Sequence, residues 1–158
     1  MLSLSTSLLN LLCKNRRAGD NLSSMDGFNI KISTSIHSDD YEDTLEASYP
    51  CEYYFGENVC RIKYTDSEAG FTVVKVCADK SEITMRRQSS FPISLKPGFT
   101  CEVSYNSPYG TIPMEITAKS ITLALSENGG RLEYKADFLI GGAYQVNNTV
   151  IEISSDNS

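Results

Sequence analysis

Residues 121–136 have the sequence ITLALSENGGRLEYKA, in which two alternating segments flank an Asn-Gly dipeptide. Asn128-Gly129 favours a two-residue primed turn, because both residue types tolerate the positive φ angles that this turn requires. A turn there makes every core pair apolar: Leu125 with Leu132, Leu123 with Tyr134, and Ile121 with Ala136. A shift of one residue would place Leu125 opposite Glu133. The stretch therefore predicts a β-hairpin with one buried face.

The same period of two continues along the chain from Phe28, and it is the spacing of side chains on one face of a β-strand. The first predicted strand, 28–37, has an apolar face made of Phe28, Ile30, Ile32, Thr34 and Ile36. Pro50 is expected to bend the chain. Turn residues recur at intervals of about 8–12 residues, which is typical of sandwiches and barrels. Further strands are expected at 41–49, 53–55, 59–65, 71–78, 82–87, 100–105, 112–125 and 130–136, followed by a last strand that includes 146–153.

Two changes of parity predict local irregularities in these strands. Apolar positions before Lys119-Ser120 are even-numbered and those after it are odd-numbered, so a β-bulge is expected there. In the last strand the apolar set changes from Val146 to Ile151 and Ile153. A second irregularity is therefore expected near Val150.

The length of 158 residues fits one domain, since a chain of this size can bury roughly 68–70% of its unfolded surface in one core. We predict an all-β fold, a single antiparallel, up-and-down closed β-barrel of about 8–10 strands, because closure removes exposed sheet edges. The barrel is expected to occupy residues 25–158. Residues 1–24 do not share the alternation and are expected to be a disordered or mis-annotated extension, with Met25 as the true start.

Charge and cysteine content exclude several kinds of partner. Twenty acidic and fourteen basic residues give a net charge of −6 and a pI near 4.8, and the basic residues do not cluster. Nucleic acid and anionic membrane surfaces are therefore not expected partners, because binding to phosphates draws on clustered positive charge. The five cysteines are odd in number and lack Cys-x-x-Cys spacing, which favours a reducing cytoplasm. Four of them lie in expected strands, where a free cysteine acts as a small apolar residue.

The sequence contains no recognisable catalytic or metal-binding constellation. Its only histidine, His37, shares the polar face of its strand and should point to solvent. The acidic turn at Asp39-Asp40 lacks the glycine and the glutamate of a calcium loop at the required offsets. The signatures of metalloproteases, nucleophile elbows and phosphate-binding loops are absent. We therefore expect no enzyme activity, no catalytic residue, no metal and no cofactor.

Arg87 has the greatest functional interest, because Ile83, Met85 and Arg87 share parity and should all point into the barrel. An inward guanidinium requires an anion or several hydrogen-bond acceptors. On one interpretation Arg87 anchors a carboxylate ligand. The ligand-binding residues would then be Arg87, Tyr64, Met85, Tyr105 and Tyr134. On the other interpretation Arg87 closes one end of the barrel against carbonyl groups or a glutamate.

A family resemblance rests on three segments: Tyr105-Asn-Ser-Pro-Tyr-Gly110 with the alternating strand after it, the Glu-Asn-Gly-Gly hairpin, and Leu132-Glu-Tyr134. Together they resemble the YwiB-like family, known as a domain of unknown function, and the likeness extends from about Phe28 to Ser154. The resemblance implies a calycin-like or lipocalin-like barrel and no assigned activity. The family has an Arg-x-Gly-like element near Arg86-Arg87. Here Gln88-Ser89-Ser90 follow, so the tight bend that a glycine allows is not implied.

The expected function is non-catalytic: a cytoplasmic barrel that binds a small, partly apolar or anionic ligand in its interior. The main alternative is a structural or protein-interaction module with a filled core, whose outer surface would include Tyr53, Phe55 and Phe99. A third alternative is an enzyme that uses the barrel mouth. A ligand site requires a concave space of about 300 Å³ or more with convergent polar groups, and this requirement distinguishes the first two.

Overall fold

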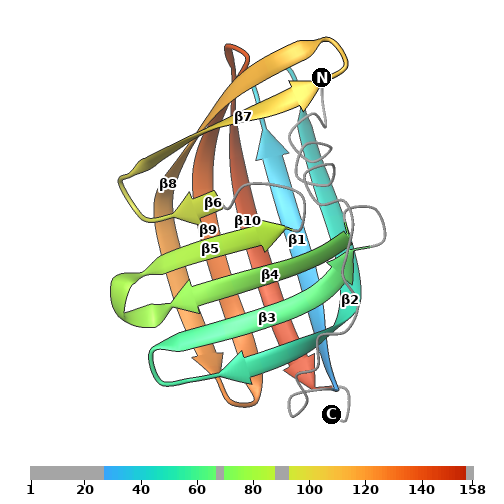
Figure 1. Cartoon of the computed structure of the whole chain (residues 1–158), viewed down its shortest axis with the longest axis vertical. Coiled ribbons are helices and arrows are strands. Elements are labelled where there is room, and N and C mark those ends of the chain that lie inside the picture. The colour runs from blue at the N-terminus through green and yellow to red at the C-terminus, as the bar shows by residue number, and fades with distance from the viewer. Residues whose placement is uncertain (1–26, 67–69, 88–92, 156–158) are drawn as a thin grey trace.

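Strands make up nearly all of the computed structural model, which describes residues 27–66, 70–87 and 93–155 (Figure 1). The ten strands of the described residues are β1 (Phe28–His37), β2 (Glu42–Phe55), β3 (Val59–Asp66), β4 (Gly70–Cys77), β5 (Glu82–Arg87), β6 (Ile93–Leu95), β7 (Thr100–Ser107), β8 (Gly110–Ser126), β9 (Gly129–Ile140) and β10 (Ala143–Ser155). One 3₁₀ turn, η1 (Ala78–Lys80), joins β4 to β5. The all-β prediction is confirmed.

All ten strands form one antiparallel sheet in the order β6-β5-β4-β3-β2-β1-β10-β9-β8-β7. The first and last strands pair along a ladder that runs from Phe28–Ser155 to His37–Val146. Within the described structure β6 lies against β7 and β8 without a ladder to either. In Figure 1, β1 and β8 to β10 form a back wall, and β3 to β5 cross in front of it. The sheet is therefore a nearly closed up-and-down barrel, and its two margins belong to consecutive strands.

The 14-residue strand β2 connects the two walls, because it changes partner along its length. It pairs with β1 as far as Cys51 and with β3 from Cys51 to Phe55. Pro50 lies at this change, opposite Asn29 of β1 and one residue before the β3 ladder begins. Proline has no N–H for a ladder and is tolerated where one neighbouring strand is missing. The two strands expected at 41–49 and 53–55 are therefore one strand, which begins at Glu42 and continues through Pro50.

The structure confirms one predicted irregularity and contradicts the other. Ala118 pairs with Ala136 but Ser120 pairs with Lys135, so Lys119 is the extra residue of a bulge in β8. Strand β10, in contrast, pairs with both of its neighbours without any shift. The predicted irregularity near Val150 is wrong, because the inward positions before Ile151 are simply polar.

The β8–β9 hairpin has a loop one residue earlier than predicted, and its strand pairing is shifted by two residues. Ser126 pairs with Gly129, so the loop is Glu127-Asn128, and Leu123 rather than Leu125 faces Leu132. The Ser126 hydroxyl accepts from the Asn128 N–H at 3.2 Å and donates to the Gly129 carbonyl at 3.2 Å. Serine at the first place and glycine at the fourth favour a type I turn, and this preference outweighs that of Asn-Gly. A slip of two residues leaves every side chain on its predicted face.

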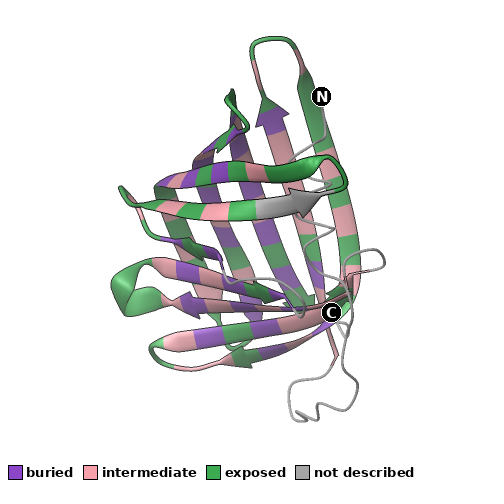
Figure 2. Cartoon of the chain, turned by 45° about the horizontal axis from the view of Figure 1, so that its top comes forward, coloured by how far each residue is buried: buried purple, intermediate pink, exposed green. Residues whose placement is uncertain are grey.

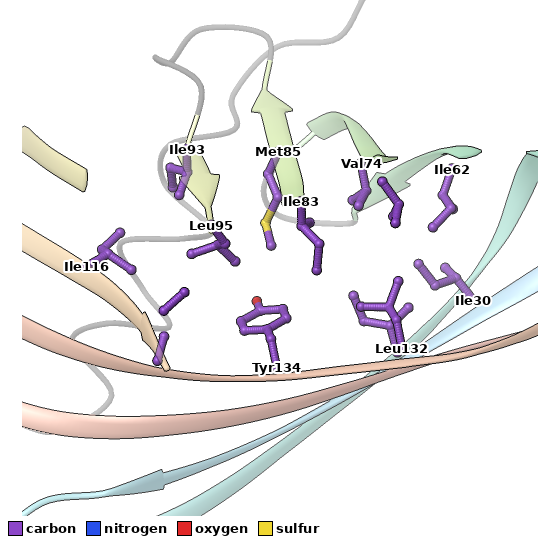
Figure 3. Packing of buried hydrophobic residues seen from close by; sticks show 14 of the residues in the cluster. Ile30, Ile62, Val74, Ile83, Met85, Ile93, Leu95, Ile116, Leu132 and Tyr134 are labelled. Atoms are coloured by element: carbon purple, nitrogen blue, oxygen red, sulfur yellow. The ribbon is translucent and has the colours of Figure 1, made fainter. Parts of the chain in front are cut away.

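Alternation along the strands produces one buried face, and this face is the interior of the barrel (Figure 2). Apolar side chains fill much of it (Figure 3). In the close-up, Ile83 and Met85 on β5 and Leu95 on β6 point toward Tyr134 and Leu132 on the back wall. The core therefore joins the two crossing walls.

Tyr53 belongs to this core, so its expected position on the outer surface is wrong. Its side chain is fully buried, its hydroxyl donates to the Ser126 carbonyl at 2.7 Å, and its ring centroid lies 5.2 Å from that of Phe28. Phe55 has the same parity on β2 and packs against the core. Phe99 is 61% exposed, as expected for an outer residue.

The described residues contain no helix with the length and hydropathy needed to cross a membrane. The predicted extension, residues 1–24, lies outside the described residues.

We expect Gly130→Ala to reduce the free energy of unfolding by about 3 kcal/mol, because it adds a collision to backbone strain. Gly130 has a φ of 141°, and a Cβ there would collide with the Ala124 carbonyl oxygen of β8. Urea denaturation measures the change. Gly142→Ala is the matched control, since Gly142 also has a positive φ, 90°, but open space around the added Cβ. Its loss should be only about 1 kcal/mol, and equal losses for both variants would contradict the role of the close approach.

Candidate functional site

Arg87 is buried at the end of β5, with 7% of its surface exposed. Ile83 and Met85 precede it on the same face of the strand and are buried as well, whereas Arg86 between them is exposed. The inward orientation predicted from parity is therefore the one that the structure has. A guanidinium inside a largely apolar barrel is the most unusual feature of the core, because burial of charge is unfavourable unless the charge is compensated.

Arg87 lies close to two of the residues that the sequence analysis associated with it. Its Nη2 donates to the Met85 sulfur at 3.9 Å, and its charge acts on the Tyr134 hydroxyl from across the barrel. Met85 and Tyr134 come from opposite walls, and in Figure 3 the Met85 side chain points toward the Tyr134 ring. The structure thus brings together three of the five predicted site residues.

The other two predicted residues are placed differently. Tyr64 is only partly buried and stacks on Tyr49, with ring centroids 5.5 Å apart and an interplanar angle of 16°. On the inner face it pairs with Thr72, which in turn pairs with Arg87. Tyr64 and Arg87 are therefore two strands apart, about 10 Å by strand spacing. The backbone of Tyr105 pairs with Ile112, but its side chain lies outside the described residues.

Strand β10 contributes three buried polar residues that sequence reasoning missed: Gln145, Asn147 and Thr149. The Gln145 Nε2 donates to the Asn147 Oδ1 at 3.0 Å, and the Thr149 hydroxyl oxygen lies 3.1 Å from that of Thr34 on β1. These positions share the parity of Ile151 and Ile153, and this shared parity is the signal that could have identified them. The interior is therefore apolar along much of its length and polar at Arg87, at Tyr134 with its partner Thr149, and along β10 as far as Gln145.

Burial raises the pKa of the Tyr134 hydroxyl above its ordinary value of 10.0. A hydrogen bond to Thr149 and the positive charge of Arg87 act in the opposite direction and lower it. Tyr134 is paired with Thr149 across the β9–β10 ladder, so the hydrogen bond between them follows directly from the register. At neutral pH this region presents a neutral phenol, a guanidinium, two amides and hydroxyl groups. Such a set can orient a polar or anionic group, but it contains no activated nucleophile.

The remaining candidates for chemistry lie outside this region. His37 has a half-exposed side chain on the outer face, and its Nδ1 is 3.3 Å from the Glu42 Oε2. Cys51, Cys60, Cys77 and Cys101 are free thiols on four strands. In the part of the chain that the structure describes, no three His, Cys, Asp or Glu residues come together in a way that could hold a metal ion.

The fold and this interior define a small antiparallel β-barrel with a polar region inside. Residues 30–153 match the family model described as "Domain of unknown function (DUF1934)", so the chain belongs to this family. No curated protein matches the sequence. Among solved structures, the ywiB protein from Bacillus subtilis is similar, with a TM-score of 0.69 and 20% sequence identity over 81% of this chain and 90% of that chain. The predicted resemblance to the YwiB-like family is confirmed, and at this identity the structural likeness concerns the fold alone.

The buried tyrosines predict loss of stability in alkaline solution. Burial raises the pKa of Tyr134 and of Tyr53 above 10.0, the ordinary value for tyrosine. As pH rises through about 10, the unfolded chain loses protons that the folded chain retains, so the free energy of unfolding should fall. Urea denaturation from about pH 8 to about pH 11 measures this slope, which Tyr134→Phe should reduce by at most about 1.4 kcal/mol per pH unit. Tyr54→Phe, at an exposed position, should leave the slope unchanged. If Tyr134→Phe kept the wild-type slope, the raised pKa of Tyr134 would not be a cause of the alkaline loss of stability.

Proposed function

We propose that this chain binds a small, partly apolar carboxylate inside the barrel and that it is not an enzyme. The observation that carries this proposal is the burial of Arg87 beside Tyr134, whose hydroxyl is hydrogen-bonded to Thr149 of β10. A guanidinium offers a planar fork of N–H donors whose geometry matches a carboxylate. In a chain with a net charge of −6, an inward cation makes the interior locally attractive to an anion.

The neighbouring uncharged groups support the same ligand chemistry. Asn147 and Thr149 supply donors and acceptors without adding negative charge, so they can orient a carboxylate or a nearby hydroxyl group. Asn147 pairs across the ladders with Ala136, and Ala136 pairs with Ala118. These alanines are the smallest inward side chains beside the polar region, and small side chains occupy the least interior volume. The adjoining apolar core is the environment that a short hydrocarbon or aromatic group would prefer.

A protein-interaction module with a filled core is the second candidate function. It is favoured by the way in which Met85 and Tyr134 from opposite walls approach each other in the close-up (Figure 3). On this alternative the exposed large side chains would provide the contact surface. Phe99 and Tyr144 are 61% and 55% exposed, and the Lys96 Nζ lies 4.9 Å from the centroid of the Phe99 ring.

We propose that the chain acts in the cytoplasm, without nucleic acid and without a membrane. The acidic balance of charge supports the absence of polyanionic partners. The free thiols of the described cysteines are compatible with a reducing compartment.

Thermal unfolding in the presence of decanoate and of benzoate tests the interior site. A ligand that binds only the folded chain adds about 2.7 kcal/mol of stability at one hundred times its Kd, so at least one carboxylate should raise the Tm by several degrees. Arg87→Ala should abolish this increase. Arg86→Ala is the matched control, because Arg86 is the adjacent arginine but is exposed, and this variant should keep the increase.

Arg87→Met provides a second variant of similar length in case the alanine variant unfolds, and it should also lose the response. If neither carboxylate raises the Tm of the wild type, or if the increase persists without the Arg87 guanidinium, the ligand proposal is wrong. The first result would leave the interaction module as the better candidate.

A further inference from the structure

The outer face of the back wall is hollowed into an open groove of about 600 Å³. The groove crosses four strands, from His37 on β1 through β10 and β9 to Ser120 and Thr122 on β8. It lies beside the bulge at Lys119, and an extra residue bends a strand and increases its twist. The groove is separate from the barrel interior, because its lining residues alternate with inward ones: Val146 and Asn148 flank the buried Asn147 on β10, and Glu133 and Lys135 flank the buried Tyr134 on β9.

The strand register places polar side chains in a row along this groove. Ser120 pairs with Lys135, and Lys135 pairs with Asn148. Adjacent strands are about 4.8 Å apart, so the row presents a hydroxyl, an ammonium and an amide within about 10 Å. Thr122 and Glu133 form the next outward pair. The groove therefore offers both donors and acceptors at close spacing.

The charges of the groove are nearly balanced. Glu133 also binds Arg131, with 3.3 Å between Oε1 and Nη2, and His37 binds Glu42. Within the described residues Lys135 is in no ion pair of its own. One ammonium beside one compensated carboxylate does not form the cluster of cations that binding of a polyanion requires. A ligand with many uncharged hydroxyl groups fits better, because each hydroxyl both donates and accepts.

An apolar strip accompanies the polar row. Val146 lies in the groove, and Tyr144, the next outward residue of β10, is 55% exposed. A side-chain hydrogen bond joins the Tyr144 hydroxyl to Asp137 and orients the ring. Tyr144 pairs with Leu139, which is also exposed. An exposed aromatic ring is amphipathic, and the C–H face of a sugar ring can pack against it.

From these observations we infer that the groove is a binding site for a neutral, polyhydroxylated ligand of the carbohydrate class. The Ser120, Lys135 and Asn148 side chains bind its hydroxyl groups, and Val146 with Tyr144 contacts its C–H face. This site is independent of the interior site proposed above, so each can fail without the other.

Two-dimensional ¹H–¹⁵N NMR of the full chain tests the inference with three probes: maltotriose, N,N′,N″-triacetylchitotriose, and inorganic phosphate at matched ionic strength. At least one saccharide should shift the amide signals of Ser120, Lys135 and Asn148, with a Kd of about 1 mM, and phosphate should not. Asn148→Ala should weaken this binding about tenfold. Thr65→Ala, on the exposed face of β3, is the matched control and should bind as the wild type does.

Ser120→Tyr is a second variant that fills the groove and should abolish the saccharide shifts even if Asn148→Ala disturbs the sheet. The inference is overturned if neither saccharide shifts these signals, if phosphate alone shifts them, or if the saccharide shifts persist in Ser120→Tyr.

Discussion

The barrel depends on the pairing of its first and last strands. Without the β1–β10 ladder, the remaining strand pairs would leave two separate sheets, β1 to β6 and β7 to β10, and the apolar faces of both would be exposed to water. This ladder joins segments that are more than one hundred residues apart, and long-range pairing slows folding because a large loop must close first. It also positions the interior chemistry, since it brings Thr34 to Thr149, and Thr149 to Tyr134 through the adjacent ladder.

Much of the fold could be predicted from the sequence because period-two alternation reports directly which face of a strand is buried. The β8 bulge was found in this way, since apolar residues must stay on the inner face when an extra residue is inserted. The same argument placed Arg87 in the interior, where the side chain is 7% exposed. Odd–even position along one strand does not identify neighbours across the barrel, however. It could group Met85 with Arg87 on β5, but the distance from these residues to Tyr134 on β9 depends on how the two walls cross.

The failures occurred where polar residues occupy inward positions or where two turn preferences compete. Gln145 and Asn147 face inward, so a pattern based on apolar residues misread their strand as irregular. These buried residues belong to the most polar part of the interior, which is where function is expected to override simple hydrophobic patterning. At the β8–β9 hairpin, the Ser126 hydroxyl binds Asn128 and Gly129, the loop lies one residue earlier than predicted, and the strand register changes by two residues. Competition between such local hydrogen bonds is difficult to resolve from residue types alone.

The ladder that closes the barrel also has a consequence for engineering. Phe28 and Ser155 are direct partners, so the beginning of the first strand lies beside the end of the last strand. A unit with adjacent ends can be inserted into a loop of another protein without forcing that loop apart. The same geometry permits a short linker between these ends and new termini in the 96–99 connection, where the sheet margins already lie. Such a circular permutant would keep every ladder of the native sheet.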